Sequence, residues 1–344
     1  MVKINDMTEP EIQDINKIAA LDYEWSKLDG KTVLISGGTG FIGQFLINVF
    51  KCRNEKYGNK IKVISCSRHG RDSERDVEYL SHDITKPLRT DKKVDYILHL
   101  ASNTHPKQYA AEPVGTITTN IFGTYNLLQF AVEHKVTRFL LASSVEIYGD
   151  GGDEPMAENY CGYIDCNTAR AGYNEAKRLS ESLCQSFIAQ YGVDCVIARL
   201  ARCFGADKKA DSKAMAQFMQ CAIDGNDIVL KSKGEQRYSY CYVADAASGL
   251  IKVLLDGVCG NAYNVSDDDE GKTLGDYARH IAECAGRKVV FDLSGANNQG
   301  VSKSVRALID TDKLKALGWT PQYAVSDALT RTYDILTRVK NDRA

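Results

Sequence analysis

The sequence lacks several features that would narrow its class at once. It has no excess of charge of either sign, because 43 basic and 45 acidic residues give a formal net charge of -2 over 344 residues. This balance, with basic residues scattered along the chain, argues against nucleic acid or an anionic membrane as a partner. No run of about 18 apolar residues occurs, so we expect no membrane insertion.

Paired cysteine motifs are also missing. The 11 cysteines are odd in number, form no CxxC pair, and mostly lie in apolar surroundings such as "VISCSR" at 63–68. They indicate reduced thiols in the core instead of a disulfide framework or a zinc site, and the six dispersed histidines form no metal-binding set. The first residues lack the apolar core of a signal peptide. We therefore expect a cytoplasmic protein without a bound metal, and peripheral membrane attachment stays open.

The chain does contain a series of apolar runs that alternate with helical segments. The runs cover 31–37, 60–68, 94–102, 137–144 and 193–201. Strands that are apolar throughout and alternate with helices are typical of a parallel sheet covered on both faces. With 44% hydrophobic residues the chain can bury a sizeable core. We predict a doubly wound α/β fold.

A glycine-rich turn follows the first run. In "LISGGTGFIG" at 34–43, four glycines, Gly37, Gly38, Gly40 and Gly43, lie between a strand and a helix. Glycines there permit a tight turn and a close approach of a pyrophosphate, and the helix N-terminus attracts the anion. The spacing fits both GxxGxxG and GxGxxG, so it predicts a dinucleotide without naming the enzyme class.

The end of the second run bears on which dinucleotide is bound. Ser67 and Arg68 stand where an Asp or Glu would hold the ribose hydroxyls of NAD. Without that carboxylate a 2'-phosphate is not repelled, and the guanidinium can pair with it, which favours NADP. The alternative is an exposed Arg68 with NAD still bound. Downstream, Asp83 and Ile84 follow a third strand, where the carboxylate could accept from the adenine amino group.

Two segments carry the candidate chemistry. In "YNEAK", Tyr173 and Lys177 are four residues apart on one face of a predicted helix, so the ammonium can bring the phenol into the range of a general base. In "LLASSVEIYGDG" at 140–151, strand alternation predicts that Ser144, Glu146 and Tyr148 share one face. Glu146 could instead be a solvated or structural acid at a polar strand end.

These residues together resemble the extended short-chain dehydrogenase/reductases, specifically the NAD-dependent epimerase/dehydratase family of nucleotide-sugar enzymes. The resemblance covers nearly the whole chain from about residue 29 and includes "TNIFGTYNLL", "ASSVEIYG" and "YVADAASGL". It implies a Rossmann domain, a tightly bound NAD(P), and transient oxidation at C4 of a nucleotide sugar. It implies that Ser144, Tyr173 and Lys177 act as a triad. It also implies a homodimer built by the helices at 116–134 and 173–191, with ordinary internal helices as the alternative.

The same resemblance implies a division of the chain and a set of cofactor contacts. We expect a helical extension at 1–29, a dinucleotide-binding Rossmann domain at 30–204 to which 238–262 return, and a substrate-binding lobe from 205–237 and 263–344. The expected cofactor contacts are Gly37, Thr39, Gly40, Phe41, Ile42, Gly43, Ser67, Arg68, Asp83, Ile84, Leu100, Ala101, Ser102, Tyr173, Lys177 and Leu200.

Within the family, the texture is most similar to that of UDP-glucuronate decarboxylases. The segments "SHDITKPL" and "EIYGD" look like theirs, and Arg170 stands three residues before Tyr173 as it does in them. This implies that Glu146 is catalytic at C5 once C4 is a ketone, and that Arg170 and Arg306 bind substrate, Arg306 at the diphosphate. A 4,6-dehydratase and a 4-epimerase are the alternatives, and a non-catalytic NAD(P)-binding regulator or scaffold is the alternative from another class.

Two departures separate the chain from that pattern. Seven residues before the final Asp of "RYSYCYVAD", where the family usually has Arg, this chain has Tyr238, and its arginine is Arg237, which a one-residue shift turns to the other strand face. In "RLARCFGAD", Arg202 stands where Asn is common, and Ala206 replaces the usual Pro. We expect Arg202 either to contact a substrate phosphate or carboxylate or to form a local ion pair.

Overall fold

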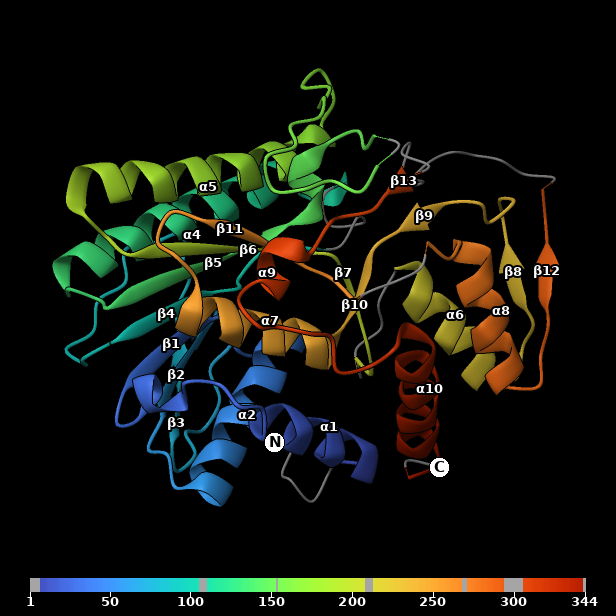
Figure 1. Ribbon diagram of the computed structural model, residues 1–344, viewed down its shortest axis with the longest axis horizontal. Helices are drawn as coiled ribbons and strands as arrows, with labels where there is room; N and C mark the ends of the chain where they lie inside the picture. The colour runs from blue at the N-terminus through green and yellow to red at the C-terminus, as the bar shows by residue number, and fades with distance from the viewer. Residues whose placement is uncertain are drawn as a thin grey trace.

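The computed structural model is built around a parallel sheet of seven strands, and it describes residues 7–104, 110–152, 154–207, 213–267, 271–293 and 306–342 (Figure 1). The strands of this sheet are β1 (Thr32–Ser36), β2 (Lys62–Ser67), β3 (Val77–Ser81), β4 (Tyr96–His99), β5 (Arg138–Ser144), β6 (Cys195–Leu200) and β11 (Ala262–Val265). Their order is β11-β6-β5-β4-β1-β2-β3, and every neighbouring pair is parallel. The strand order reverses between β1 and β4, which is where ligands bind in open α/β sheets.

Helices cover both faces of this sheet, as Figure 1 shows. They are α4 (Pro113–Glu133) and α5 (Ala171–Tyr191) on one face and α2 (Phe41–Tyr57) and α7 (Val243–Asp256) on the other, and α1 (Glu9–Ala19) packs against α2 and α7. Alternating residues of β1 explain the two layers, because Val33 and Ile35 join a core cluster with α2, whereas Leu34 joins a second cluster with α4. The prediction of a doubly wound α/β fold is confirmed.

The remaining elements lie mostly on one side of the sheet (Figure 1). They are η2 (Trp25–Leu28), η3 (Val145–Tyr148), β7 (Arg202–Phe204), α6 (Ala214–Ile223), β8 (Ile228–Leu230), β9 (Arg237–Tyr238), β10 (Tyr240–Tyr242), α8 (Leu274–Cys284), β12 (Val289–Phe291), β13 (Arg306–Ala307), α9 (Asp312–Lys315) and α10 (Val325–Asn341). The strands among them pair in parallel as β10 with β7, β12 with β8 and β13 with β9. The proposed division at 1–29, 205–237 and 263–344 includes residues outside the described ones and stays a prediction, and the sheet itself reaches Val265.

A single buried carboxylate joins α1 to both the sheet layer and α10. The Asp14 side chain is 1% exposed and accepts hydrogen bonds from the phenols of Tyr242 and Tyr323, each across 2.6 Å. It also pairs with Arg331 of α10 at 2.7 Å. Helix α1 begins with a capping box of Thr8 and Glu11, so its first turn has its own cap. The Asp14 junction therefore holds three elements that are distant in sequence.

The end of β5 differs from the prediction. The strand stops at Ser144, and Val145–Tyr148 forms the 3-10 turn η3, so Ser144, Glu146 and Tyr148 do not share a strand face. The Ser144 hydroxyl caps the turn by accepting from the Glu146 amide at 3.2 Å. Tyr148 is fully buried and donates to Asn264. Alternation failed here because a capping serine ends the extended backbone that the pattern presumed.

Two further rings, those of His99 and Trp319, are buried in the core. His99 is 2% exposed and bonded on both ring nitrogens, so it is a core histidine. Trp319 is buried and donates to Ser248 of α7 at 2.9 Å, so it packs against the sheet-covering helix as well as the smaller elements. None of the 11 cysteines, all of which lie in the described part of the chain, forms a disulfide.

Candidate active site

The glycine turn after β1 is too closely packed for side chains. A Cβ on Gly37, whose φ is +76°, would lie 2.9 Å from the Ala101 Cα, and one on Gly43 would lie 2.5 Å from the Gly37 carbonyl oxygen. Gly40 is the N-cap of α2, and no side chain caps this helix. The first-turn amides of α2 are therefore available to an anion, and the close backbone contact gives a pyrophosphate room to approach. The turn fits a dinucleotide.

The ends of β2 and β3 place the residues that would surround an adenosine. Arg68 is exposed, and Ser67 donates to the His69 carbonyl oxygen across 2.8 Å. The Asp83 carboxylate accepts from the Thr85 amide at 3.0 Å, and this hydrogen bond, with smaller contributions from the charges of Lys86 and Arg68, lowers its pKa. The described end of β2 therefore carries a cation and no carboxylate.

The end of β4 lies against the glycine turn through Ser36. The Ser36 hydroxyl is 2.7 Å from His99 Nδ1 and accepts from the Ala101 amide at 3.2 Å. Burial, followed by the Lys177 charge, lowers the pKa of His99 to about 3, so its ring is neutral at physiological pH. Ser102 donates to Asn120 of α4 at 2.9 Å. This network fixes the 100–102 segment, which we expect to line a cofactor.

Helix α5 brings Tyr173 and Lys177 to the carboxyl end of β5. Both side chains are buried, at 5% and 4% exposure, and the Lys177 Nζ lies 6.0 Å from the centre of the Tyr173 ring. The ammonium donates to the Ala142 carbonyl oxygen at 2.9 Å. Burial, opposed by the charge of Glu181, lowers the pKa of Lys177 to about 8. The cation needed to stabilise a phenolate is therefore held near the phenol.

The sequence did not predict the hydrogen bonds of Glu181, which lies next to Lys177 on α5. Glu181 is 9% exposed and accepts from Ser143 at 2.5 Å and from Arg199 Nη2 at 2.7 Å. Burial acts to lower the pKa of Arg199, yet the hydrogen bonds and charge of Glu181 outweigh it and raise that pKa. The signal in the sequence was the spacing, because Glu181 follows Lys177 by four residues on the same helix face.

The next face of α5 holds the η3 turn. Asn174 donates to the Glu146 carbonyl oxygen at 2.8 Å, and Arg178 donates to the Ile147 carbonyl oxygen at 2.6 Å. The turn that carries Ser144 and Glu146 is thus fastened to the helix that carries Tyr173. The structure brings together the four residues that the sequence named as catalytic through α5, β5 and η3.

The Glu146 side chain points to a cation. Arg202 Nη2 lies 3.1 Å from Glu146 Oε1, and the Arg202 Cζ lies 3.9 Å above the centre of the Tyr238 ring. The sequence had left open a substrate contact or a local ion pair for Arg202, and here the ion pair forms with the candidate acid. Tyr238 was not expected to take part, because it lies on β9, 36 residues after Arg202 on β7.

The remaining substrate candidates lie on other elements. Arg170 is the exposed N-cap residue of α5, three residues before Tyr173. Arg306 opens β13 and is the register partner of Arg237, so Ala307 lies beside Tyr238. Arg237 itself is exposed, as the one-residue shift predicted. The roles of Arg170 and Arg306 stay predictions.

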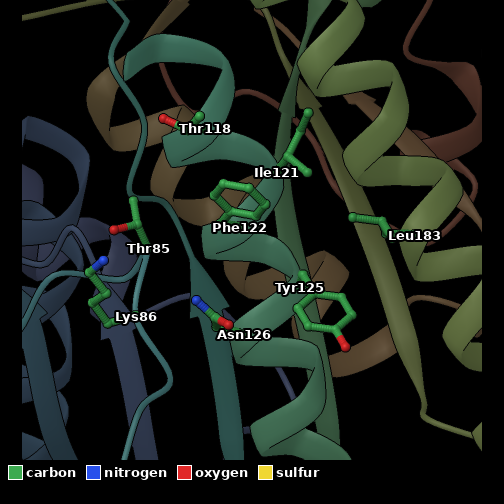
Figure 2. Close-up of a pocket in the computed structure, with 8 residues that line it drawn as sticks. All are labelled: Thr85, Lys86, Thr118, Ile121, Phe122, Tyr125, Asn126 and Leu183. Carbon is green, nitrogen blue, oxygen red and sulfur yellow. The ribbon is translucent and has the colours of Figure 1, made fainter. Parts of the chain in front are cut away.

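A surface pocket lies apart from this cluster, on the outer side of α4 (Figure 2). Figure 2 shows Tyr125 of α4 on the side of Leu183 of α5, Thr85 and Lys86 on the opposite side, and the Phe122 ring between them. Phe122 is 50% exposed and Tyr125 is 43% exposed. The pocket is therefore a surface hollow lined by both polar and apolar side chains, and it does not contain the candidate catalytic groups.

No cluster of three or more His, Cys, Asp or Glu side chains that could hold a metal ion occurs among the described residues. In the same part of the chain, no helix combines the length and apolarity that crossing a bilayer requires.

The sequence is similar to a known family and to individual members of it. The model described as "NAD dependent epimerase/dehydratase family" matches residues 33–266. UDP-glucuronic acid decarboxylase 1 of Xenopus tropicalis is 31% identical over 352 residues, covering 96% of this chain and 79% of that protein. UDP-glucuronic acid decarboxylase 5 of Arabidopsis thaliana is 31% identical over 307 residues, covering 86% of each.

The similarity extends to solved structures. UDP-glucuronic acid 4-epimerase from Bacillus cereus, in complex with UDP-glucuronic acid and NAD, superposes with a TM-score of 0.75 at 18% identity, covering 90% of this chain and 99% of that one. At this identity the likeness establishes the fold.

Proposed function

This chain belongs to the NAD dependent epimerase/dehydratase family, and from that membership we propose that it is a UDP-glucuronate decarboxylase that works through transient oxidation at C4. It is an NAD(P)-dependent enzyme that modifies nucleotide sugars. The observation that carries the finer proposal is the junction of α5 with η3. There, Tyr173 and Lys177 share a face of the helix whose next face holds the turn of Ser144 and Glu146.

The residues have distinct tasks in this proposal. Tyr173 removes the proton from the 4-hydroxyl of the sugar, and the Lys177 ammonium stabilises the phenolate that does so. Ser144 donates to the oxygen at C4 as it becomes a ketone. The chemistry that a bound nicotinamide supplies is acceptance of the hydride from C4.

Glu146 acts one carbon further along the ring. A ketone at C4 makes C5 able to lose its carboxylate as carbon dioxide, because the electrons of the broken bond enter the enolate. Glu146 lies on the turn beside Ser144, which supports a role for its carboxylate next to that carbon. In a neutral hexose the same carboxylate would serve elimination of water.

We propose that the cofactor is NAD(P), bound tightly, with NADP favoured over NAD. The exposed Arg68 and the absence of a carboxylate at the described end of β2 support the preference for a 2'-phosphate. NAD, which the Bacillus cereus structure contains, is the alternative. Denaturing the purified protein and determining the mass of the released dinucleotide distinguishes the two.

The decisive experiment for the reaction is incubation of the purified protein with a panel of UDP-, dTDP-, GDP- and CDP-sugars. A product lighter by one carbon dioxide supports decarboxylation, and a product lighter by one water supports a 4,6-dehydratase. An unchanged mass with an altered NMR spectrum supports a 4-epimerase. Tyr238, in place of the usual arginine, is the observation that keeps these two alternatives open.

A non-catalytic regulator or scaffold is the alternative from another class. A binding protein has no need of a buried ammonium beside a phenol, so Lys177 and Tyr173 argue for catalysis. If no sugar is turned over while the dinucleotide binds tightly, the enzymatic proposal fails and this alternative replaces it.

We also propose a cytoplasmic homodimer that pairs the outer faces of α4 and α5. These faces expose Phe122, Tyr125 and Leu179, and the hollow in Figure 2 lies between them. Large apolar side chains grouped on a helix pair are typical of a protein interface. Sedimentation of the wild-type protein beside a Phe122→Glu variant tests the proposal, and a wild-type monomer would overturn it.

A further inference from the structure

The guanidinium of Arg202 contacts two residues that are distant from each other in the sequence, Glu146 and Tyr238. Glu146 Oε1 accepts from Nη2 across 3.1 Å, and the ring of Tyr238 lies under the guanidinium carbon at 3.9 Å. Within the described part of the chain, the buried Nη1 atom has no hydrogen-bond partner. Arg202 therefore has hydrogen-bonding capacity that Glu146 alone does not use.

These contacts come from three segments that meet at the end of the sheet. Glu146 lies on η3 after β5, Arg202 opens β7 just after β6, and Tyr238 ends β9. A cation is thus held in the site from β7, and β9 contributes the ring of Tyr238 that lies against it. The tyrosine ring restricts the plane of the guanidinium, which pre-orients its donors.

The ion pair is accessible to a ligand. The side chains of Arg202 and Glu146 are 23% and 26% exposed, so neither is sealed in the core. A guanidinium matches a carboxylate with two parallel hydrogen bonds, and a ligand carboxylate can therefore replace Glu146 without leaving the cation unpaired. A neutral hydroxymethyl group offers no negative charge and cannot make that exchange.

Glu146 also affects an anionic ligand when Arg202 is absent. An unpaired carboxylate close to C5 would repel a sugar that carries a carboxylate on the same carbon. The pairing of Arg202 therefore determines whether the site attracts or repels a uronic acid.

We propose that Arg202 selects nucleotide sugars that carry a carboxylate on C5, by exchanging the Glu146 carboxylate for that of the sugar and thereby releasing Glu146 to act at C5. This inference rests on the proposed function and names the residue that sets its substrate class. No bond is made or broken in the exchange, and the net charge of the site falls by one when the uronic acid enters.

Equilibrium titration with UDP-glucuronate and with UDP-glucose tests the exchange. The purified protein is titrated with its cofactor bound and with Tyr173→Phe in every variant, so that neither sugar is turned over during the measurement. The two ligands differ only at C5, so the ratio of their dissociation constants isolates the carboxylate. We expect Arg202→Gln to weaken UDP-glucuronate binding by about tenfold or more and to change UDP-glucose binding by less than about twofold. Arg202→Lys keeps the positive charge and loses the two parallel donors of the guanidinium. The ratio of its two dissociation constants should therefore lie between that of the wild type and that of Arg202→Gln.

Glu146→Gln is the more stringent test, because this variant should bind UDP-glucuronate more tightly, whereas Arg202→Gln should bind it more weakly. Removing the competing carboxylate leaves Arg202 available, so UDP-glucuronate should bind about threefold to tenfold more tightly while UDP-glucose is unaffected. Arg237→Gln is the matched control, since it removes an exposed arginine from the neighbouring strand position and should leave the ratio unchanged. Thermal melting and cofactor absorbance show whether each variant is folded and loaded.

Each result has a defined meaning. If Arg202→Gln keeps the wild-type ratio, or if Glu146→Gln weakens UDP-glucuronate binding, the exchange is wrong even when the wild-type enzyme releases carbon dioxide. If the wild-type protein binds and converts UDP-glucose in preference to UDP-glucuronate, the exchange is wrong and a dehydratase or epimerase is indicated. If it binds neither, the proposed function fails together with the inference.

Discussion

Lys177 of α5 donates a hydrogen bond from its ammonium to the backbone carbonyl of Ala142 in β5, across 2.9 Å. This bond ties the helix that carries Tyr173 to the strand that ends in Ser144. The ammonium is buried, so the carbonyl oxygen and the nearby Glu181 are what keep it charged. The geometry of the proposed triad therefore depends on how α5 packs on β5.

Replacing Tyr173 by Phe should lower kcat by about a thousandfold, because the variant removes the group that takes the proton from the sugar hydroxyl. Binding of the cofactor and the melting temperature should change little, since only one oxygen is lost. Tyr160→Phe is the control, as its phenol donates to the Asp150 carbonyl oxygen. Steady-state kinetics with UDP-glucuronate measure the effect, and wild-type turnover by the Tyr173 variant would contradict the assignment.

The lowered pKa of Lys177 predicts a pH dependence of stability. Its pKa is about 8 in the folded protein against 10.5 for an ordinary lysine, so between these values the unfolded chain binds more protons. The free energy of unfolding should therefore rise with pH across this window because of this group. Lys177→Met removes the contribution, so its stability advantage over wild type should shrink between pH 8 and pH 10.5 in urea titrations. A constant difference at all pH values would show that Lys177 titrates normally.

Glu181→Gln should destabilise the fold by about 3 kcal/mol, because Arg199 would keep its charge in a buried place without its anion. The same substitution should lower the pKa of Lys177 further, since Glu181 acts to raise it. Glu175→Gln on the same helix is the control, because that acid forms a partly exposed pair with Arg178 and should contribute less than about 0.5 kcal/mol. Equal losses in the two variants would contradict a structural role for the Glu181 network.

Gly43→Ala should abolish cofactor retention. Its Cβ would lie 2.5 Å from the Gly37 carbonyl oxygen and 2.7 Å from the Gly38 Cα, so the glycine turn must shift. Gly115→Ala in α4 is matched, since its Cβ would meet the Glu112 Cβ at an ordinary 3.7 Å, and it should be neutral or stabilising by about 0.5 kcal/mol. Absorbance of the purified variants measures the bound dinucleotide, and a fully loaded Gly43→Ala protein would contradict the tight packing.

Glu146→Gln should stop decarboxylation and leave cofactor binding intact. Oxidation at C4 uses Tyr173 and Lys177, so the variant should still form reduced cofactor from UDP-glucuronate and accumulate a 4-keto sugar. Rapid mixing with detection of the reduced nicotinamide, followed by mass analysis of the sugar, separates the two steps. If this variant releases carbon dioxide at the wild-type rate, Glu146 is not catalytic and is only a polar residue after β5.

The sequence predicted the parts of the site that depend on short-range pattern. The glycine turn, and the pairing of Tyr173 with Lys177, follow from spacings within one strand-turn-helix unit or one helix. The direction of Glu146 did not follow, because strand alternation cannot show that Ser144 ends the strand and caps a turn.

Contacts between segments that are distant in the sequence could not be predicted from residue spacing. Nothing in the spacing of Arg202 and Tyr238 indicates that a guanidinium from β7 lies on a ring from β9. The two strands belong to different small sheets. Ser239 joins β9 to β10, and the pairing of β10 with β7, where the Arg202 amide donates to the Ser239 carbonyl oxygen at 3.2 Å, brings the two side chains near each other. A contact of this kind can be identified only from the tertiary structure, because residue spacing in a single sequence does not indicate it.

The Asp14 junction has a consequence for how the molecule comes apart. Its carboxylate bonds Tyr242, which precedes α7, as well as Tyr323 and Arg331, which lie beside and within α10. Detachment of α1 would leave two phenols and a guanidinium without their shared hydrogen-bond acceptor. Separating α7 or α10 alone therefore has a high free-energy cost. The sheet layer and α10 should accordingly lose their hydrogen-exchange protection together, as a single cooperative unit.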